Sequence, residues 1–201
     1  FLEIKPDSRI CRGFCEAAAR SGFPAAADWG VGEILYGSVQ EWICQSRKGW
    51  RKIDNFAVLR ARHRALERPP RAYVFVGDNG WSERDEEAVA GISRSGVLAA
   101  AFIHAVSDDA SRPPPLPEDR ETAEGAPVLY FRTYVGAAVK AMRLGFLGCD
   151  ALARVVAVAE REAALDAANM PPGSINARVF GDDVAVAKAA LARRLDVEPG
   201  V

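Results

Sequence analysis

Apolar and polar positions in the middle of the chain switch between the spacing of strands and that of helices. Four apolar residues that favour β-structure occupy positions 73–76, and they end abruptly at Gly77-Asp78-Asn79-Gly80. This pattern predicts a buried strand that opens into a tight turn. A helix at about 83–94 and strands at 98–106 and 127–132 are expected next. The alternation predicts an α/β fold, in which a mainly parallel sheet has helices on both faces.

Helical spacing of apolar residues predicts further elements on either side of this region. Gly181-Asp182-Asp183 is interpreted as the N-cap of the last helix, and the Pro-rich, acidic stretch 107–126 is expected to be a mobile surface loop. The expected helices are 9–20, 39–46, 50–67, 134–145, 149–169 and 182–195, and two more short strands are expected at 1–4 and 34–36.

Composition changes this picture little. The 201 residues are 49% apolar and 26% charged with a net charge of -1, which is ordinary for a globular protein and gives no reason to expect a nucleic-acid partner. No stretch approaches the roughly 18 apolar residues that a membrane-spanning helix needs. The four scattered cysteines lack the spacing of a zinc site and are expected to be reduced. A cytoplasmic location is therefore expected.

Asp78 and Glu83 are candidate metal ligands. Ligands of open α/β sheets bind at the carboxyl ends of the strands, and Asp78 stands at such an end. Glu83 can bring a second oxygen to the same place, and Mg²⁺ binds one or two protein carboxylates together with water and phosphate oxygens. The alternative is structural, because acids in the first turn of a helix favour the positive end of its dipole.

Lys52 is a candidate phosphate-binding residue. It precedes the first apolar position of the expected helix 50–67, where its ammonium and the free backbone N–H groups of a helix N-terminus would both face an anion. A lysine that neutralises phosphoryl oxygens and a carboxylate that holds Mg²⁺ are two parts of a site for phosphoryl transfer. Covalent phosphatase chemistry would also need a nucleophile on a neighbouring strand end.

Several stretches together resemble the catalytic domain of the actin-patch-associated phosphatidate phosphatases, a branch of the haloacid dehalogenase (HAD)-like superfamily. The likeness covers about residues 1–148 and lies in the order and spacing of these stretches. They are Phe1-Leu2 with Pro6-Asp7-Ser8, Leu35-Tyr36-Gly37-Ser38, Arg51-Lys52-Ile53-Asp54-Asn55-Phe56, Val74-Phe75-Val76-Gly77-Asp78-Asn79-Gly80, Ala101-Phe102-Ile103-His104, and Tyr130-Phe131-Arg132-Thr133-Tyr134-Val135-Gly136-Ala137-Ala138.

The resemblance implies a Rossmann-type, HAD-like fold and Mg²⁺-dependent hydrolysis of a phosphomonoester, which in the named family is phosphatidate. Lys52 matches the family's lysine beside the phosphorylated nucleophile. Asp78 matches its metal-binding acid, with Glu83 in place of a later aspartate, and Asn79 and Gly80 are expected to bind phosphate. The implied organisation is a phosphatase domain over residues 1–148 that lacks its first strand and nucleophile motif, followed by a helical extension over 149–201 packed on it.

Two departures from the family pattern bear on activity. No Asp-x-Asp nucleophile motif occurs in the sequence, and Glu3 stands where the family has a Ser or Thr that would hydrogen-bond the phosphate. These 201 residues alone are therefore expected to have no turnover. The alternative function is a catalytically degenerate HAD-like module that binds a protein or an anionic surface through the basic segment 47–71, which carries nine Lys or Arg against two acids. The alternative interpretation of that segment is structural, as the solvent-exposed face of a helix.

The expected partners are a phosphorylated small molecule or a phospholipid, with peripheral contact to membranes left open. Three further residues stand at expected strand ends. His104 suits either the edge of a site or a structural hydrogen bond, and Arg132 and Tyr134 suit either the same edge or buried packing.

Overall fold

A computed structural model of the chain describes residues 9–20, 35, 48–80, 84–106, 112–113, 115–166, 168 and 170–195. The chain divides into two compact units, Phe1–Arg71 and Ala72–Val201, and each is described by itself. The strands expected at 1–4 and 34–36 and the helix at 39–46 lie outside the described residues, apart from Leu35. Glu3 and Glu83 lie outside them as well.

The described part of the first unit contains two helices, α1 (Arg9–Arg20) and α3 (Lys48–His63). The bounds of α1 agree with the sequence prediction. Helix α3 ends four residues earlier than predicted. After His63 the backbone forms the tighter hydrogen bonds of a 3₁₀ turn, from Ala65 N to Arg62 O and from Leu66 N to His63 O. Arg64 and Arg68 of the basic segment 47–71 therefore lie beyond the end of α3.

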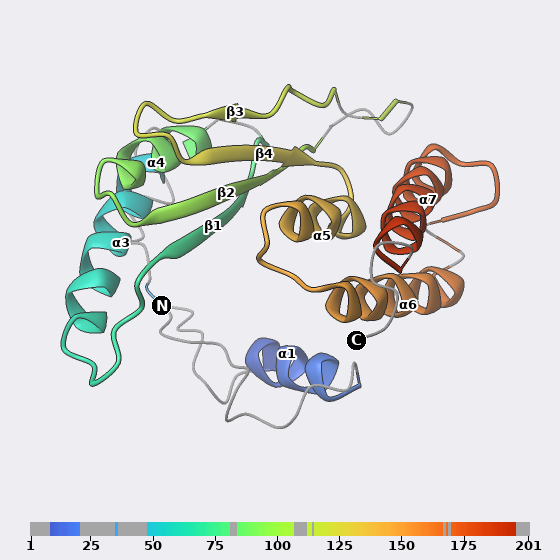
Figure 1. The fold of residues 1–201 in the computed structure, drawn as a ribbon, viewed down its shortest axis with the longest axis horizontal. Coiled ribbons are helices and arrows are strands. Elements are labelled where there is room, and N and C mark those ends of the chain that lie inside the picture. The colour runs from blue at the N-terminus through green and yellow to red at the C-terminus, as the bar shows by residue number, and fades with distance from the viewer. Residues whose placement is uncertain are drawn as a thin grey trace. The chain divides into compact units, whose positions relative to one another are not determined.

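The second unit is built on a mixed, open sheet of four strands in the order β1-β2-β4-β3 (Figure 1). Strands β1 (Tyr73–Asp78), β2 (Leu98–His104) and β4 (Pro127–Phe131) are parallel, and the short β3 (Arg120–Glu121) pairs antiparallel with β4. The α/β class and the mainly parallel sheet are confirmed. The prediction of a loop throughout 107–126 is wrong at β3, a two-residue exposed strand without apolar alternation.

Helices cover both faces of this sheet, as predicted. On one face, Val89 of α4 (Arg84–Ser93) packs against Ile103 and Tyr130. On the other face, Ala137 and Ala141 of α5 (Tyr134–Arg143) pack against side chains of β2 and β4: Ala100, Phe102, Leu129 and Phe131.

Strand β1 is not buried on both sides, so that part of the prediction is wrong. Val74 and Val76 are 46% and 61% exposed. They are in register with Ala100 and Phe102 of β2 and so point to the face that carries α5. That helix lies over β2 and β4, whereas β1 is the end strand. Among the described residues of the second unit, no helix therefore covers the outer half of this face.

Helices α5, α6 (Cys149–Leu165) and α7 (Ile175–Leu195) form a bundle with a shared core (Figure 1). Leu152 of α6 is fully buried at its centre, between Val139 of α5 and Ala187 of α7 among others. The predicted extension 149–201 thus consists, where described, of two helices that pack on α5. The boundary between the two compact units falls after Arg71.

Helix α7 begins seven residues earlier than predicted. Ser174 provides the cap, because its hydroxyl oxygen accepts the backbone N–H of Ala177 at 3.2 Å. The interpretation of Gly181-Asp182-Asp183 as an N-cap is therefore wrong, and these residues lie inside the helix. Among the described residues, no helix is both long enough and apolar enough to cross a membrane.

Candidate functional site at the carboxyl edge of the sheet

Asp78 is the last residue of β1 and is exposed at the carboxyl edge of the parallel strands. Its Oδ1 accepts the backbone N–H of Gly80 at 2.8 Å, which closes a tight turn. Its own backbone N–H donates to Oδ2 of Asp85 at 2.9 Å. Both the strand end and the turn that follows are thus fixed by carboxylates.

Asp85 is a buried acid that the sequence analysis missed. It lies in the first turn of α4 and is only 5% exposed. Its carboxylate accepts a hydrogen bond from the backbone at the end of β1. A Cβ atom on Gly77 would lie 2.1 Å from Oδ2 of Asp85. The sequence signal for this contact is the glycine directly before Asp78, because only a residue without a side chain leaves room for the carboxylate.

Asn79 and Gly80 have structural partners that restrict the predicted phosphate contacts. Oδ1 of Asn79 accepts the backbone N–H of Val106 at 2.9 Å, and its backbone N–H donates to His104 O at 3.1 Å. The N–H of Gly80 donates to Asp78. This geometry joins the ends of β1 and β2, and it engages the Gly80 N–H that a phosphate would otherwise use.

Lys52 lies in a different position along its helix from the one predicted. Because α3 begins at Lys48, Lys52 is in the second turn, past the free N–H groups of the first turn. Its side chain is half-buried. Lys52 belongs to the first unit and Asp78 to the second, so the structure describes the two residues separately.

Asp78 is the one sequence-predicted metal ligand that lies among the described residues. No group of three or more His, Cys, Asp or Glu side chains able to hold a metal ion occurs among them. A single exposed carboxylate still suits Mg²⁺, which keeps several waters and takes further oxygens from a substrate phosphate. Asp78 thus fits the role of one such ligand.

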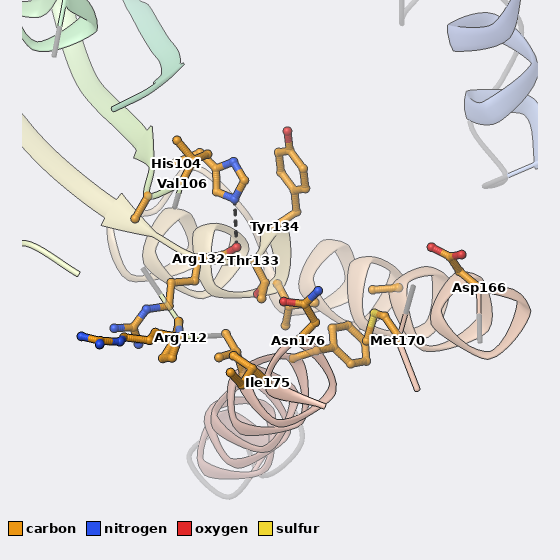
Figure 2. A pocket seen from close by; sticks show the side chains of 16 residues that line it. His104, Val106, Arg112, Arg132, Thr133, Tyr134, Asp166, Met170, Ile175 and Asn176 are labelled. Carbon is orange, nitrogen blue, oxygen red and sulfur yellow. Dashed lines mark hydrogen bonds between the residues drawn. The ribbon is translucent and has the colours of Figure 1, made fainter. Parts of the chain in front are cut away.

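A cavity of about 640 Å³ opens beside this edge, between the ends of β2 and β4 and the bundle of α5, α6 and α7 (Figure 2). His104, Arg132 and Tyr134 all line it, so the structure brings together the three strand-end residues that the sequence singled out. Much of the remaining wall is apolar and comes from α7 and the connection before it, including Met170, Ile175 and Phe180.

Charged side chains stand at opposite ends of this cavity. Figure 2 shows the guanidinium groups of Arg112 and Arg132 near one another at one end, and the carboxylate of Asp166 at the other. Cationic groups that converge on a largely apolar pocket are a usual arrangement for holding a small organic anion.

His104 makes the structural hydrogen bond considered for it, and it also lines the cavity. Its Nε2 lies 3.0 Å from the carbonyl oxygen of Arg132, so Nε2 carries the proton of this hydrogen bond. Its ring stacks on Phe131 at a centroid distance of 5.1 Å and on Tyr134 at 5.9 Å. The histidine therefore fixes the backbone that presents Arg132 while it forms part of the cavity wall.

Thr133, which also lines the cavity, joins α5 to α7. Its Oγ1 accepts the N–H of Gly136 at 3.0 Å and caps α5, and its hydroxyl donates to Oδ2 of Asp183 at 2.5 Å. A Cβ atom on Gly136 would lie 2.7 Å from the same Asp183 oxygen. Asp183, which the sequence analysis assigned to a helix cap, thus holds two helices together.

A second polar cluster fastens the far edge of the sheet. The Tyr130 hydroxyl donates to Oε1 of Glu86 at 2.7 Å, and Nε of Arg120 donates to the Tyr130 oxygen at 3.2 Å. Arg120 also pairs with Glu86. Burial, followed by the hydrogen bond to Glu86, raises the pKa of Tyr130 above its usual value. The cluster ties β3 and β4 to α4.

Comparison of the chain with protein-family models, curated proteins and solved structures gave no match.

Proposed function

We propose that this chain is a HAD-like domain that supports Mg²⁺-dependent hydrolysis of a phosphomonoester, as in the phosphatidate phosphatases it resembles. The observation that carries the proposal is the position of Asp78, exposed at the carboxyl end of a parallel strand with its backbone held by a buried acid. Ligands of open α/β sheets bind at this edge. The Rossmann-type topology of the family belongs to the same proposal.

The proposal gives each predicted residue one role. Asp78 and Glu83 would hold Mg²⁺, and Lys52 would neutralise the phosphoryl oxygens. Bound Mg²⁺ supplies charge neutralisation for the transferring phosphoryl group. The proposal also requires an Asp-x-Asp motif in the natural full-length protein, because none occurs in these 201 residues.

The test is phosphate release from phosphatidate and from p-nitrophenyl phosphate by the natural full-length protein with Mg²⁺. Asp78→Asn should abolish the activity, because it removes the charge at the metal while keeping an oxygen for the Gly80 N–H. Asp150→Asn, which neutralises an exposed acid at the start of α6, is the matched control and should leave the activity unchanged. If the folded wild-type protein releases phosphate from neither substrate, the proposed phosphatase activity is contradicted.

Metal binding can be tested apart from turnover. Mg²⁺ should raise the melting temperature of the wild-type chain and of Asp150→Asn, but not that of Asp78→Asn. Equal shifts in all three proteins would remove Asp78 as a ligand.

A second candidate function is a catalytically degenerate module that binds an anionic surface. The observation that favours it is the exposure of Arg62, Arg64 and Arg68 at and beyond the end of α3. Co-sedimentation with phosphatidylserine vesicles should weaken when Arg64 and Arg68 are both changed to Gln, and it should weaken less with the control pair Arg154→Gln and Arg161→Gln. If both double variants lose vesicle binding to the same extent, the binding reflects only the net charge of the protein and not a site at the end of α3.

A further inference from the structure

We propose that the cavity between the sheet edge and the three-helix bundle binds an organic acid with an apolar body, whose carboxylate lies at Arg112 and Arg132. The proposal concerns a binding site apart from Asp78, which does not line this cavity. It is independent of the phosphatase proposal, and either can fail without the other.

The size and lining of the cavity suit a small molecule. Its volume of about 640 Å³ lies within the range of roughly 300–1,000 Å³ that is usual for small-molecule sites. One wall is apolar and consists of Met170, Ile175, Val179 and Phe180. These residues belong to the carboxy-terminal part of the chain, which the family resemblance does not cover, so that part of the chain supplies the surface for the apolar body.

The charges at the two ends fix the orientation of the ligand. Arg112 and Arg132 present guanidinium groups at one end, and Asp166 presents a carboxylate at the other (Figure 2). An anionic head is therefore attracted to the arginine end and repelled from the other. The body then extends past Thr133 toward Ile175 and Met170, which lie between the charged ends in the same view.

A carboxylate fits the arginine end better than a phosphate dianion does. Arg132 and Val179 also line a smaller cavity together with Lys140, Asp182 and Asp183. Because Lys140 is paired with Asp119, the remaining charge behind the arginine is that of the two acids. The Thr133 hydroxyl already donates to Asp183 and is engaged. A planar monoanion needs only the paired donors of a guanidinium, whereas a dianion would bring a second charge toward the two aspartates.

The arginine end is held in place by the fold. The carbonyl group of Arg132 accepts a hydrogen bond from His104, whose ring packs against the rings of Phe131 and Tyr134. Arg132 directly precedes Thr133, which caps α5. The backbone on both sides of the guanidinium is thus fixed before a ligand arrives, which lowers the entropic cost of binding.

Isothermal titration calorimetry of the whole chain with decanoate tests the proposal. Saturable binding of one decanoate per chain is expected, and Arg132→Gln and Arg112→Gln should each weaken it by about tenfold or more, because each removes a charge-assisted contact. Arg178→Gln is the matched control, since Arg178 is exposed on α7 and does not line the cavity. That variant should bind as the wild type does.

A filling variant tests the location independently of charge. Asn176 lines the cavity and is exposed, so Asn176→Trp can occupy the space without disturbing the helical core. It should abolish decanoate binding and leave the melting temperature close to that of the wild type. If Arg132→Gln does not fold by circular dichroism, Arg112→Gln and Asn176→Trp decide the question.

Three results would overturn the proposal. The first is no saturable binding of decanoate to folded wild-type protein. The second is a lack of specificity, either because all variants bind decanoate as tightly as the wild type does or because the cation decyltrimethylammonium binds as tightly as decanoate. The third is tighter binding of decyl phosphate than of decanoate, which would overturn the assignment of a carboxylate.

Discussion

A single buried carboxylate, that of Asp85, determines how the strand end of Asp78 is presented. Its Oδ2 accepts the Asp78 N–H, and Gly77 leaves the space that it occupies. A buried acid is stable only with its hydrogen bonds satisfied, so the turn and the first residues of α4 depend on one another. The position of Asp78 is thus set before any ligand binds.

Gly77→Ala should destabilise the protein by about 1–3 kcal/mol, because the new methyl group would overlap the Asp85 carboxylate. Urea unfolding followed by circular dichroism measures the loss. Gly181→Ala is the control, since a Cβ atom there would meet nothing within 4 Å and alanine favours the helix in which the residue lies. A loss of the same size in both variants would show that Asp85 is not responsible.

Tyr130 should make the stability of the second unit decrease at alkaline pH. Its pKa is raised in the folded protein, chiefly by burial. Above about pH 10 the unfolded chain therefore releases this proton while the folded chain keeps it, so the free energy of unfolding falls as the pH rises. Below that pH the tyrosine is protonated in both states and adds no slope.

The measurement compares urea unfolding of wild type and Tyr130→Phe between about pH 8 and pH 11. The variant should be less stable at about pH 8, because it loses the contacts with Glu86 and Arg120, and its further decrease with pH should be smaller. Parallel curves for the two proteins would contradict the assignment.

Part of the candidate site follows from the sequence, and part requires the fold. Asp78, His104 and Arg132 follow from local patterns, since each stands where an apolar β-run ends. Asp85 and Asp183 do not, because their partners are set by how helices pack on strands and on each other. No spacing rule places an acid of α7 against the cap of α5, fifty residues away.

At the scale of elements, the contact between Thr133 and Asp183 joins the N-terminus of α5 to the middle of α7. Gly136 allows the close approach of the two helices at this point. The three helices share one apolar core, and this polar contact sets how α7 is positioned along α5.

Thr133→Ala should destabilise the protein by about 1–2 kcal/mol, since it removes the N-cap of α5 and leaves Asp183 without the hydroxyl. Asp183→Ala should also destabilise, whereas Asp182→Ala, its exposed neighbour, should have little effect. A double-mutant cycle of Thr133→Ala with Asp183→Ala measures the coupling. Simple additivity of the two changes would contradict a direct contact.

Elements with a clear hydrophobic period were predicted to within a few residues, and the misses have physical reasons. Strand β3 has two exposed residues and is held by backbone pairing and by the contacts of Arg120, so no period of 2 is visible. The start of α7 was missed because Gly181-Asp182-Asp183 has cap chemistry, which the packing of α7 against the bundle overrides.

At the scale of the whole molecule, residues 72–201 form a compact unit with its own sheet and helical core. We expect this segment to fold when expressed alone, with a cooperative urea transition. Leu152→Ala, at the centre of the three-helix core, should lower its stability by about 2–5 kcal/mol. A gradual, non-cooperative transition of the wild-type segment would contradict its independence.

The exposed side of β1 has a consequence for the behaviour of that segment in solution. Among the described strands, β1 pairs only with β2, and it presents Val74 and Val76 beside its open edge. Open apolar edges recruit strands from other molecules. Concentrated solutions of residues 72–201 should therefore form aggregates that scatter light. Val76→Lys should keep the segment monomeric, because it places a charge at the edge where a second molecule would dock.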